Sequence, residues 1–434
     1  MKPAILFLLV GLGAVFFLFF VPNEVRVLPK NSNVVTEQPP SSPVLPVFPE
    51  SPRPTSSILS VGSTKFVDAE RQSKLPNPPE VIKGIYITGW SAGSASKIDR
   101  VIALIKRTEL NAVVIDIKDY SGHVSYRTGI PEIEASGAEG EIRIVQPNAL
   151  IKKLHDNGIY VIARQTVFQD PILAKAHPEW AMENASTSKT WTDNKGLPWM
   201  DAAGKPTWDY NVAVAKDAFA RGFDEVNFDY VRFASDGDLG KIKYPFWDKK
   251  TPRSAVIKSF FKYLRENLAG EKISADLFGL STIDTWDDLG IGQVIESAYE
   301  YFDYISPMVY PSHYAKGFSG FQNPATHPYD VVKLSLDKAL TRISTTNKIV
   351  VGTTVVGTTT VEQMQEVPKF SSKLRPWLQD FDLGATYDAS MVRAQIQATY
   401  DALLSTTTAK SSHYAGWLLW DPANTYTEGA LEKE

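Results

Sequence analysis

The residues EVNFDYVRF at 225–233 form an apolar run that acquires an aspartate near its C-terminal end. Three further runs share this pattern: AVVIDIKD (112–119), KISADLFG (272–279) and LRPWLQDF (374–381). Charged groups are costly inside a sheet unless a partner or a function requires them. Several carboxylates are therefore expected to gather where these four strands end.

Four more runs have the composition of strands, at 81–90, 160–168, 304–310 and 414–421. Amphipathic helices alternate with the strands, which is typical of βα units in a parallel sheet. Eight such units predict a closed (β/α)8 TIM barrel with enlarged βα loops, in which catalytic groups lie at the C-terminal ends of the strands. An open doubly wound sheet is the alternative, but no Gly-rich phosphate loop follows the first strand.

Helices are expected between the strands wherever apolar residues recur every three to four positions. They are expected to begin near Ser96, Pro147, Asn211 and Pro252, to span about 289–300 and 328–343, and to follow Asp388. The polar stretches 120–146 and 169–210 predict long loops. The Val/Thr-rich stretch 347–373 is interpreted as an irregular insertion before strand seven, with a strand or an inserted hairpin as alternatives.

The first 80 residues differ in composition from the rest of the chain. Residues 1–21 carry eighteen uncharged, mostly apolar residues after Lys2 and Pro3, near the minimum length of a membrane span. We interpret this segment as an uncleaved signal anchor, with a cleaved signal peptide as the alternative. Residues 22–80 are rich in Pro, Ser and Val and predict a disordered linker, so that 81–434 holds the barrel. The weak positive-inside bias favours a barrel outside the cytoplasm.

Composition narrows the classes of partner. A formal net charge of -4 and a pI near 6.0 predict no nucleic-acid partner. The chain has no Cys, and its six His are scattered without the spacing of metal ligands. No metal and no cofactor are therefore expected, and the protein is expected to be a monomer. The ten Trp suit stacking against sugar faces, although a large barrel also buries many aromatic rings.

Side-chain alternation along the strands sorts the aspartates. On the run 225–233, Asp229 shares a side with Asn227, and on the next run Asp276 shares a side with Ser274. Paired carboxyls at a barrel mouth suggest glycosidic bond cleavage, in which one protonated carboxyl donates to the leaving oxygen and one carboxylate attacks or activates water. Asp229 is the candidate nucleophile or base, and Asp276 is the candidate acid.

Further side chains near strand ends are candidates for substrate binding or support. Asp116 could bind hydroxyls or orient Arg164, and Arg232 could hold Asp229 in its ionised form. Lys118 is expected on the same side of its strand as Asp116. The remaining candidates for hydroxyl contacts or stacking are Trp90, Tyr310, Trp377, Gln379 and Trp420.

Other aspartates are interpreted as structural, because an Asp at a strand end often caps a helix or fixes a loop. Asp119 precedes Tyr-Ser-Gly and Asp421 precedes Pro, so both are expected in turns. Asp380 has the opposite parity to Gln379 and ranks behind the candidate pair.

Segments at every expected strand carry a further signal: KGIYITGW, NAVVIDIKDYSG, ARQTVFQD, GFDEVNFDYVRF, SADLFG, YISPMVYPSHY, RPWLQDF and GWLLWDP. Over most of residues 81–426 they resemble the bacterial glycoside-hydrolase-like barrel family catalogued as domain of unknown function 4015. The resemblance implies a (β/α)8 glycosidase-like barrel. By analogy with retaining glycosidase barrels, it also implies Asp229 as nucleophile on strand four and a proton donor on strand five. That donor is Glu in the best-known barrels, so Asp276, with its shorter side chain, departs from the pattern.

The favoured interpretation is a membrane-tethered glycoside hydrolase that faces the cell envelope and cleaves a polysaccharide or envelope glycan. A non-catalytic glycan-binding barrel at the cell surface is the alternative, and it would keep the aromatic residues and lose one carboxylate of the pair. A metal-dependent hydrolase using Asp116, Asp229 and Asp276 is less favoured because His ligands are missing.

Overall fold

The computed structural model describes residues 67–433, except 286, 357–358 and 405–411. The expected anchor at 1–21 and most of the expected linker lie outside these residues. Among the helices of the described part, none has the length and apolar character needed to cross a membrane.

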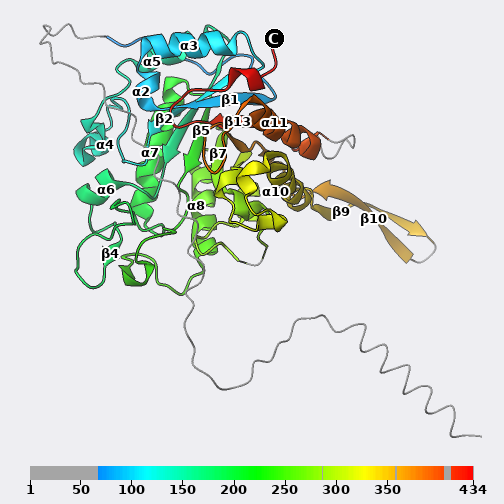
Figure 1. Ribbon diagram of the computed structural model, residues 1–434. Helices are drawn as coiled ribbons and strands as arrows, with labels where there is room; N and C mark the ends of the chain where they lie inside the picture. Colours follow the sequence, from blue (N-terminus) through cyan, green and yellow to red (C-terminus); the bar gives the residue numbers. More distant parts are fainter. Residues whose placement is uncertain (1–66, 286, 357–358, 405–411, 434) are drawn as a thin grey trace, which may run out of the picture. The chain divides into compact units, whose positions relative to one another are not determined.

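Eight parallel strand positions close into a barrel surrounded by helices (Figure 1). They are β1 (Ile82–Ile87), β2 (Ala112–Lys118), β3 (Tyr160–Thr166), β5 (Glu225–Asp229), β7 (Ile273–Phe278), β8 (Tyr304–Met308), the pair β11 (Lys373–Leu374) and β12 (Trp377–Gln379), and β13 (Gly416–Trp420). The β7–β8 and β13–β1 pairings complete the ring. The expected (β/α)8 barrel is confirmed, with a strand at each predicted position.

The seventh strand position is split at Arg375 and Pro376. Proline has no N–H to donate to a ladder, so it interrupts regular pairing. β11 pairs with β8, whereas β12 pairs with both β8 and β13. The backbone N–H of Arg375 still donates to Ile305 O at 2.9 Å, so the segment keeps its place in the ring across the break.

The stretch before it forms a separate two-stranded antiparallel sheet, β9 (Thr346–Val356) and β10 (Thr359–Pro368). The expectation of an irregular insertion was therefore wrong, and the alternative of an inserted hairpin holds. β-Branched Val and Thr favour the extended backbone of such a hairpin.

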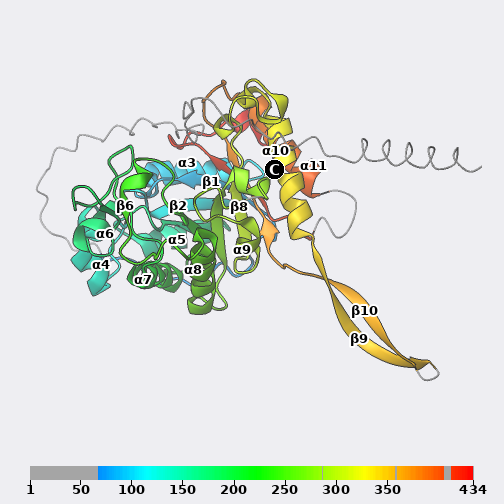
Figure 2. The same ribbon diagram turned by 90° about the horizontal axis from the view of Figure 1, so that it is seen from below.

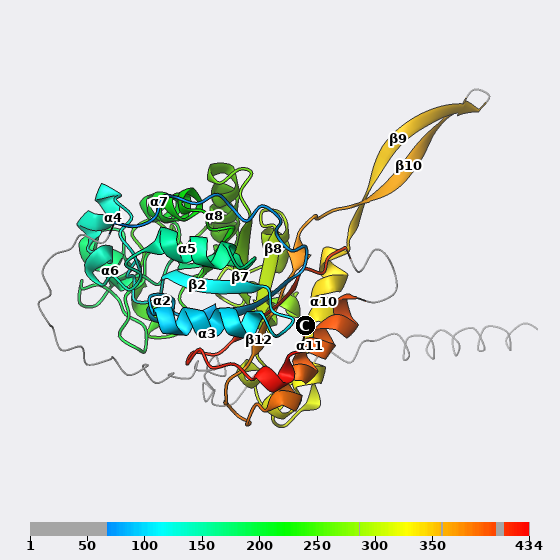
Figure 3. The same ribbon diagram turned by 90° about the horizontal axis from the view of Figure 1, so that it is seen from above.

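Helices connect the strands on the outside of the barrel: α3 (Ala95–Ile105), α5 (Pro147–His155), α7 (Lys205–Arg221), α8 (Arg253–Asn267), α9 (Ile295–Tyr299), α10 (Pro328–Ile343) and α11 (Ala389–Leu403). Short elements in the βα loops are α2 (Gly89–Ala92), α4 (Pro131–Ser136), α6 (Pro171–Ala176), β4 (Glu183–Asn184) and β6 (Ile242–Lys243). Neighbouring helices lie side by side, as Figure 2 shows for α7 and α8 and Figure 3 for α10 and α11.

Two helices differ from the expectation. α7 begins at Lys205 rather than at Asn211, with Pro206 in its first turn, a position that proline favours because the N–H it lacks has no helical partner there. α9 covers only Ile295–Tyr299 of the expected 289–300. Gly290 and Gly292, both at positive φ, hold the preceding residues in a turn.

The last part of the expected linker is held against the barrel. Asp68 accepts hydrogen bonds from the backbone N–H groups of Asn148 and Ala149 at the start of α5, at 3.0 and 3.1 Å. Further along, the N–H of Leu75 donates to Asp224 Oδ1 at 2.7 Å. Residues 67–80 therefore make ordered contacts with the barrel, although their composition resembles that of the linker before them.

Candidate active site

The barrel interior carries a column of polar side chains from β5. Glu225, at the N-terminal end of the strand, is fully buried and forms an ion pair with the fully buried Arg375. The guanidinium of Arg375 also lies over the ring of Tyr304, 4.5 Å from its centroid. This ion pair is therefore buried at the N-terminal end of β5, and Asp229 lies at the other end of the strand.

Arg164 of β3 is the centre of the polar groups at that end. Its Nη1 donates to Asp116 Oδ1 at 2.6 Å, and its Nη2 pairs with Asp229 Oδ2. Its Nε lies 3.6 Å from Asp276 Oδ2. The three carboxyls come from β2, β5 and β7, and the register places Arg164 opposite both Asp116 and Asn227. One guanidinium thus gathers the three aspartates that the sequence analysis singled out.

Asp276 is almost completely buried, and its carboxyl is held by two donors. Asn227 Nδ2 donates to Oδ1 at 2.8 Å, and the indole N–H of Trp377 donates to the same oxygen at 2.7 Å. Burial and the nearby Asp229 carboxylate raise the pKa of Asp276 to about 8, against the opposing effect of Arg164. A carboxyl that keeps its proton near neutral pH is suited to the role of general acid.

Asp229 ends β5 and lies in a strained stretch of backbone. Its Oδ1 accepts the backbone N–H of the next residue, Tyr230, at 2.6 Å, while its Oδ2 pairs with Arg164. Tyr230 has a φ of 54°, an unfavourable value for a residue with a large side chain. Both contacts of Asp229 are therefore with a cation or an N–H donor.

An aromatic wall from β1 and β13 adjoins Arg164. The hydroxyl of Tyr86 donates to Asp116 Oδ2 at 2.6 Å. The rings of Tyr86 and Trp420 stack with centroids 3.8 Å apart, and the guanidinium of Arg164 lies 4.9 Å from the Trp420 centroid. Trp377 packs edge-on against Trp420, with centroids 5.5 Å apart. Trp420 therefore lies next to the carboxyl pair, packed against Tyr86, Trp377 and Arg164.

Gln379 ends β12, and Tyr310 lies two residues after the end of β8. Tyr310 is buried edge-on against Phe381, and burial together with the Asp276 and Asp229 carboxylates raises its pKa well above the ordinary value. Gln379 accepts a hydrogen bond from the Ser312 hydroxyl at 2.9 Å and donates to Phe381 O at 2.9 Å. Its amide therefore joins two loops, whereas Tyr310 stays electrostatically coupled to the pair.

Lys118 points away from the barrel interior, contrary to the expectation. A register shift between Asp116 and Lys118 reverses the alternation of the strand, so Lys118 lies opposite Gln165. It is fully buried, pairs with Asp170 Oδ2 at 2.7 Å and donates to Thr166 O at 2.8 Å. Asp170 also caps α6, so Lys118 supports a loop and does not line the mouth.

Arg232 and Trp90 occupy other parts of the same end of the barrel. Arg164, rather than Arg232, is the cation in contact with Asp229; Arg232 lies among aromatic rings. Trp90, in the short helix α2, is 49% exposed, and the guanidinium of Arg143 lies 5.5 Å from its ring centroid.

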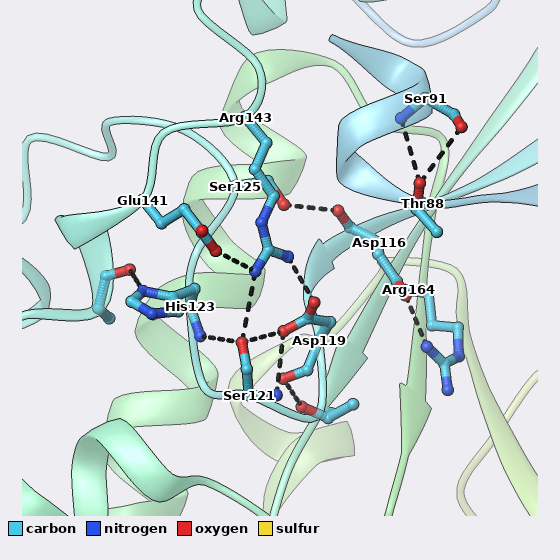
Figure 4. A network of polar contacts seen from close by, with 12 residues as sticks. Thr88, Ser91, Asp116, Asp119, Ser121, His123, Ser125, Glu141, Arg143 and Arg164 are labelled. Atoms are coloured by element: carbon cyan, nitrogen blue, oxygen red, sulfur yellow. Dashed lines mark hydrogen bonds and ion pairs between the residues drawn. The ribbon is translucent and has the colours of Figure 1, made fainter. Parts of the chain in front are cut away.

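The loop after β2 is fixed by a polar network around Asp119 (Figure 4). Asp119 accepts hydrogen bonds from both the backbone and the hydroxyl of Ser121 and pairs with Arg143, which also reaches Glu141. The hydroxyl of Ser125 donates to Asp116 O at 2.8 Å, which ties the network to the strand that carries Asp116. Asp119 is therefore a turn residue, as expected.

Asp380 and Asp421 are likewise engaged with backbone. Asp380 accepts the N–H and the hydroxyl of Thr427 at 2.9 and 2.6 Å, and burial raises its pKa to about 6. Asp421 accepts the N–H of Thr425 at 2.6 Å, as a turn former does.

A metal ion has no evident place among the carboxyls. Across residues 67–433, apart from the gaps, no group of three or more His, Asp or Glu has the arrangement of a metal site. Where Asp116, Asp229 and Asp276 converge, the space is taken by the positive charge of Arg164.

Two contributors were missed in the sequence analysis. Tyr86 was not considered, although alternation along β1 places its side chain inside the barrel, where it meets Asp116. Asn227 was placed beside Asp229 but given no role, and it bonds to Asp276 on the neighbouring strand. Strand parity could have found both residues, but not the identity of their partners.

Three solved structures are among those similar to this chain. A hypothetical protein from Ruminiclostridium thermocellum is 36% identical over 44% of this chain and 96% of its own, with a TM-score of 0.40. The PgaB (BpsB) glycoside hydrolase domain from Bordetella bronchiseptica is 13% identical over 79% of this chain and 95% of its own, with a TM-score of 0.50. The glycoside hydrolase domain of PelA from Pseudomonas aeruginosa is 11% identical over 80% and 97%, with a TM-score of 0.40.

No curated protein matches the chain. A family model described as "Putative glycosyl hydrolase domain" matches residues 84–426, which span the barrel from β1 to the turn after β13. The chain therefore belongs to the glycosyl hydrolase domain family catalogued as domain of unknown function 4015.

Proposed function

We propose that this protein hydrolyses glycosidic bonds in a polysaccharide or cell-envelope glycan, with Asp276 as proton donor and Asp229 as the carboxylate that attacks the sugar or activates water. The observation that carries the proposal is that two carboxyls with different surroundings, Asp276 and Asp229, lie beside the same guanidinium, that of Arg164. Burial and a neighbouring carboxylate raise the pKa of Asp276 to about 8, whereas the Asp229 carboxyl contacts Arg164 and a backbone N–H.

The proposed reaction uses these groups in sequence. Asp276 gives its proton to the leaving oxygen, and negative charge passes to its carboxyl, where the Trp377 and Asn227 donors stabilise it. Asp229 either bonds to the anomeric carbon or takes a proton from water on the opposite face of the sugar ring. Arg164 positions both carboxyls and lies against the ring of Trp420.

The test uses the full chain, purified in detergent, with a panel of bacterial envelope glycans and product analysis by mass spectrometry. Asp229→Asn is expected to lower product release about a thousandfold, because the new side chain is a poor nucleophile and base. Asp380→Asn is the matched control, since Asp380 is also buried with a raised pKa but bonds to Thr427, and it should keep its activity.

An Asp229→Asn variant that cleaves the glycan at the rate of the unmodified chain would contradict the mechanism. A protein that binds a glycan saturably but releases no product from any of them would instead favour the glycan-binding barrel.

Detection of the full chain in the soluble fraction after gentle lysis would contradict the proposed membrane anchor at residues 1–21.

A further inference from the structure

Arg232, in the loop that follows β5, is a buried cation without a carboxylate in contact among the described residues. It is 3% exposed. Among the described residues its hydrogen bonds are made by Nη1, which donates to Phe233 O at 3.0 Å and to Ser235 Oγ at 3.1 Å. Both acceptors are neutral, so in the described part of the chain no ion pair balances the charge of this guanidinium.

Three aromatic rings enclose the guanidinium. Its central carbon lies 4.7 Å from the centroid of Trp199, 4.8 Å from that of Phe278 and 5.4 Å from that of Tyr230. In the part of the chain that the structure describes, its Nε and Nη2 have no hydrogen-bond partner, and neither nitrogen is fully buried. The rings therefore fix the plane of the guanidinium and leave two N–H-bearing nitrogens at the edge that reaches the surface.

The electrostatic setting of Arg232 differs from that of the other buried arginines. Burial lowers the pKa of Arg232, whereas the carboxylates beside Arg164 and Arg375 outweigh burial and raise the pKa of those two groups. Asp229, Asp236 and Asp193 are close enough to act on Arg232 through space, but Asp229 is paired with Arg164, and Asp236 and Asp193 accept hydrogen bonds from loop backbone. A buried charge without a partner is costly, and a bound anion would relieve that cost.

The position of Arg232 ties it to the candidate active site. It lies three residues after Asp229, and Phe278 lies two residues after Asp276. Both segments leave the barrel at the C-terminal ends of neighbouring strands, β5 and β7. A group bound by Arg232 would therefore lie next to the sugar on which the two carboxyls act.

We propose that Arg232 binds an oxyanion carried by the sugar beside the cleaved bond, a carboxylate or a sulfate, so that the substrate is an acidic glycan. Two N–H donors side by side on a planar guanidinium match two oxygens of such a group. The inference rests on the proposed function for its place in a reaction, but the binding itself can be measured without hydrolysis.

The experiment compares binding of D-glucuronate, D-glucose 6-sulfate and D-glucose to the full chain by isothermal titration calorimetry. Both anions, or one of them, should bind at least about tenfold more tightly than glucose, and Arg232→Gln should remove that preference. Arg253→Gln is the matched control, since Arg253 also lies over aromatic rings, Phe233 and Trp247, and this variant should keep the preference. Comparison of the affinities for D-glucuronate and D-glucose 6-sulfate decides whether the bound group is a carboxylate or a sulfate.

Equal affinity for the neutral and anionic sugars, no saturable binding of either anion, or a preference that survives Arg232→Gln would overturn the proposal. If Arg232→Gln does not fold, the side-chain Nε–H resonance of Arg232 in the ¹⁵N-arginine-labelled unmodified chain, assigned with Arg232→Lys, gives the same decision. It should shift on addition of the preferred anion and stay in place with glucose.

Failure of the proposed function would be distinguishable from failure of this inference. A chain that prefers the anion but hydrolyses no glycan keeps the anion site and loses the glycosidase. A chain that hydrolyses a neutral glycan and shows no anion preference keeps the glycosidase and loses the anion site.

Discussion

Asp276 is the residue whose chemistry depends most closely on its neighbours. Burial and the Asp229 carboxylate raise its pKa, whereas Arg164, Asn227 and Trp377 oppose that rise. In the proposed mechanism Asp276 must be protonated to act as the acid. We therefore expect kcat/KM to fall as the pH rises through about 8, the pKa of the Asp276 carboxyl. The alkaline limb of the pH profile of kcat/KM is therefore expected to report the pKa of Asp276.

Trp377→Phe should move that alkaline limb to higher pH. The indole N–H stabilises the ionised form of Asp276, and its removal leaves the protonated form favoured over a wider range, by about half a pH unit or more. The measurement is the pH dependence of kcat/KM. Trp417→Phe is the control, because Trp417 donates to Tyr400 instead and its loss should leave the limb in place. A limb that moves to lower pH in Trp377→Phe would show that another group controls it.

At this scale the sequence predicted which carboxyls converge but not what holds them together. Alternation placed Asp229 and Asp276 on the interior sides of neighbouring strands. The contacts of Arg164 depend on the stagger of three strands and on one side-chain conformation, which alternation does not describe. Lys118 was misplaced because a single register shift reverses every later side chain of a strand.

At the scale of the elements, closure of the barrel depends on a close backbone approach between β1 and β13. Gly416 begins β13 with a φ of 103°, and a Cβ added there would lie 1.8 Å from Ile82 O of β1. The neighbouring atom belongs to the backbone and cannot move aside. No other residue fits this position without displacing one of the two strands.

Gly416→Ala should therefore destabilise the fold by about 2–4 kcal/mol through the positive φ and the clash. Gly158→Ala is the matched control, because Gly158 also has a positive φ, 71°, but open space around the added atom. It should lose only about 1 kcal/mol. Urea unfolding followed by tryptophan fluorescence measures both, and equal losses would show that the strand contact does not limit closure.

Element boundaries followed local signals where those were strong. Pro147 and Gly158 frame α5, and Asp388 caps α11 through the N–H of Met391 as its position suggested. The start of α7 was missed because Pro206 at its first turn was not weighed against the polar loop before it.

Across the whole molecule, the alternation of apolar strands and amphipathic helices was enough to predict the closed barrel, because eight strands buried on both faces have few other ways to pack. The Val/Thr-rich residues left the hairpin β9–β10 as one of two alternatives to an irregular insertion, since β-branched runs are compatible with a barrel strand as well as with a separate ribbon. Composition also did not mark residues 67–80 as part of the fold, because their hydrogen bonds and ion pairs are with residues far away in the sequence.

The central claim is that Asp276 donates the proton and Asp229 does not. It is tested most directly by measuring kcat/KM of Asp276→Asn on the natural glycan and on a dinitrophenyl glycoside of the same sugar, whose leaving group needs no proton. The account predicts a loss of about a hundredfold to ten-thousandfold on the glycan and little loss on the dinitrophenyl glycoside. Equal losses on both substrates, or none on either, would contradict it.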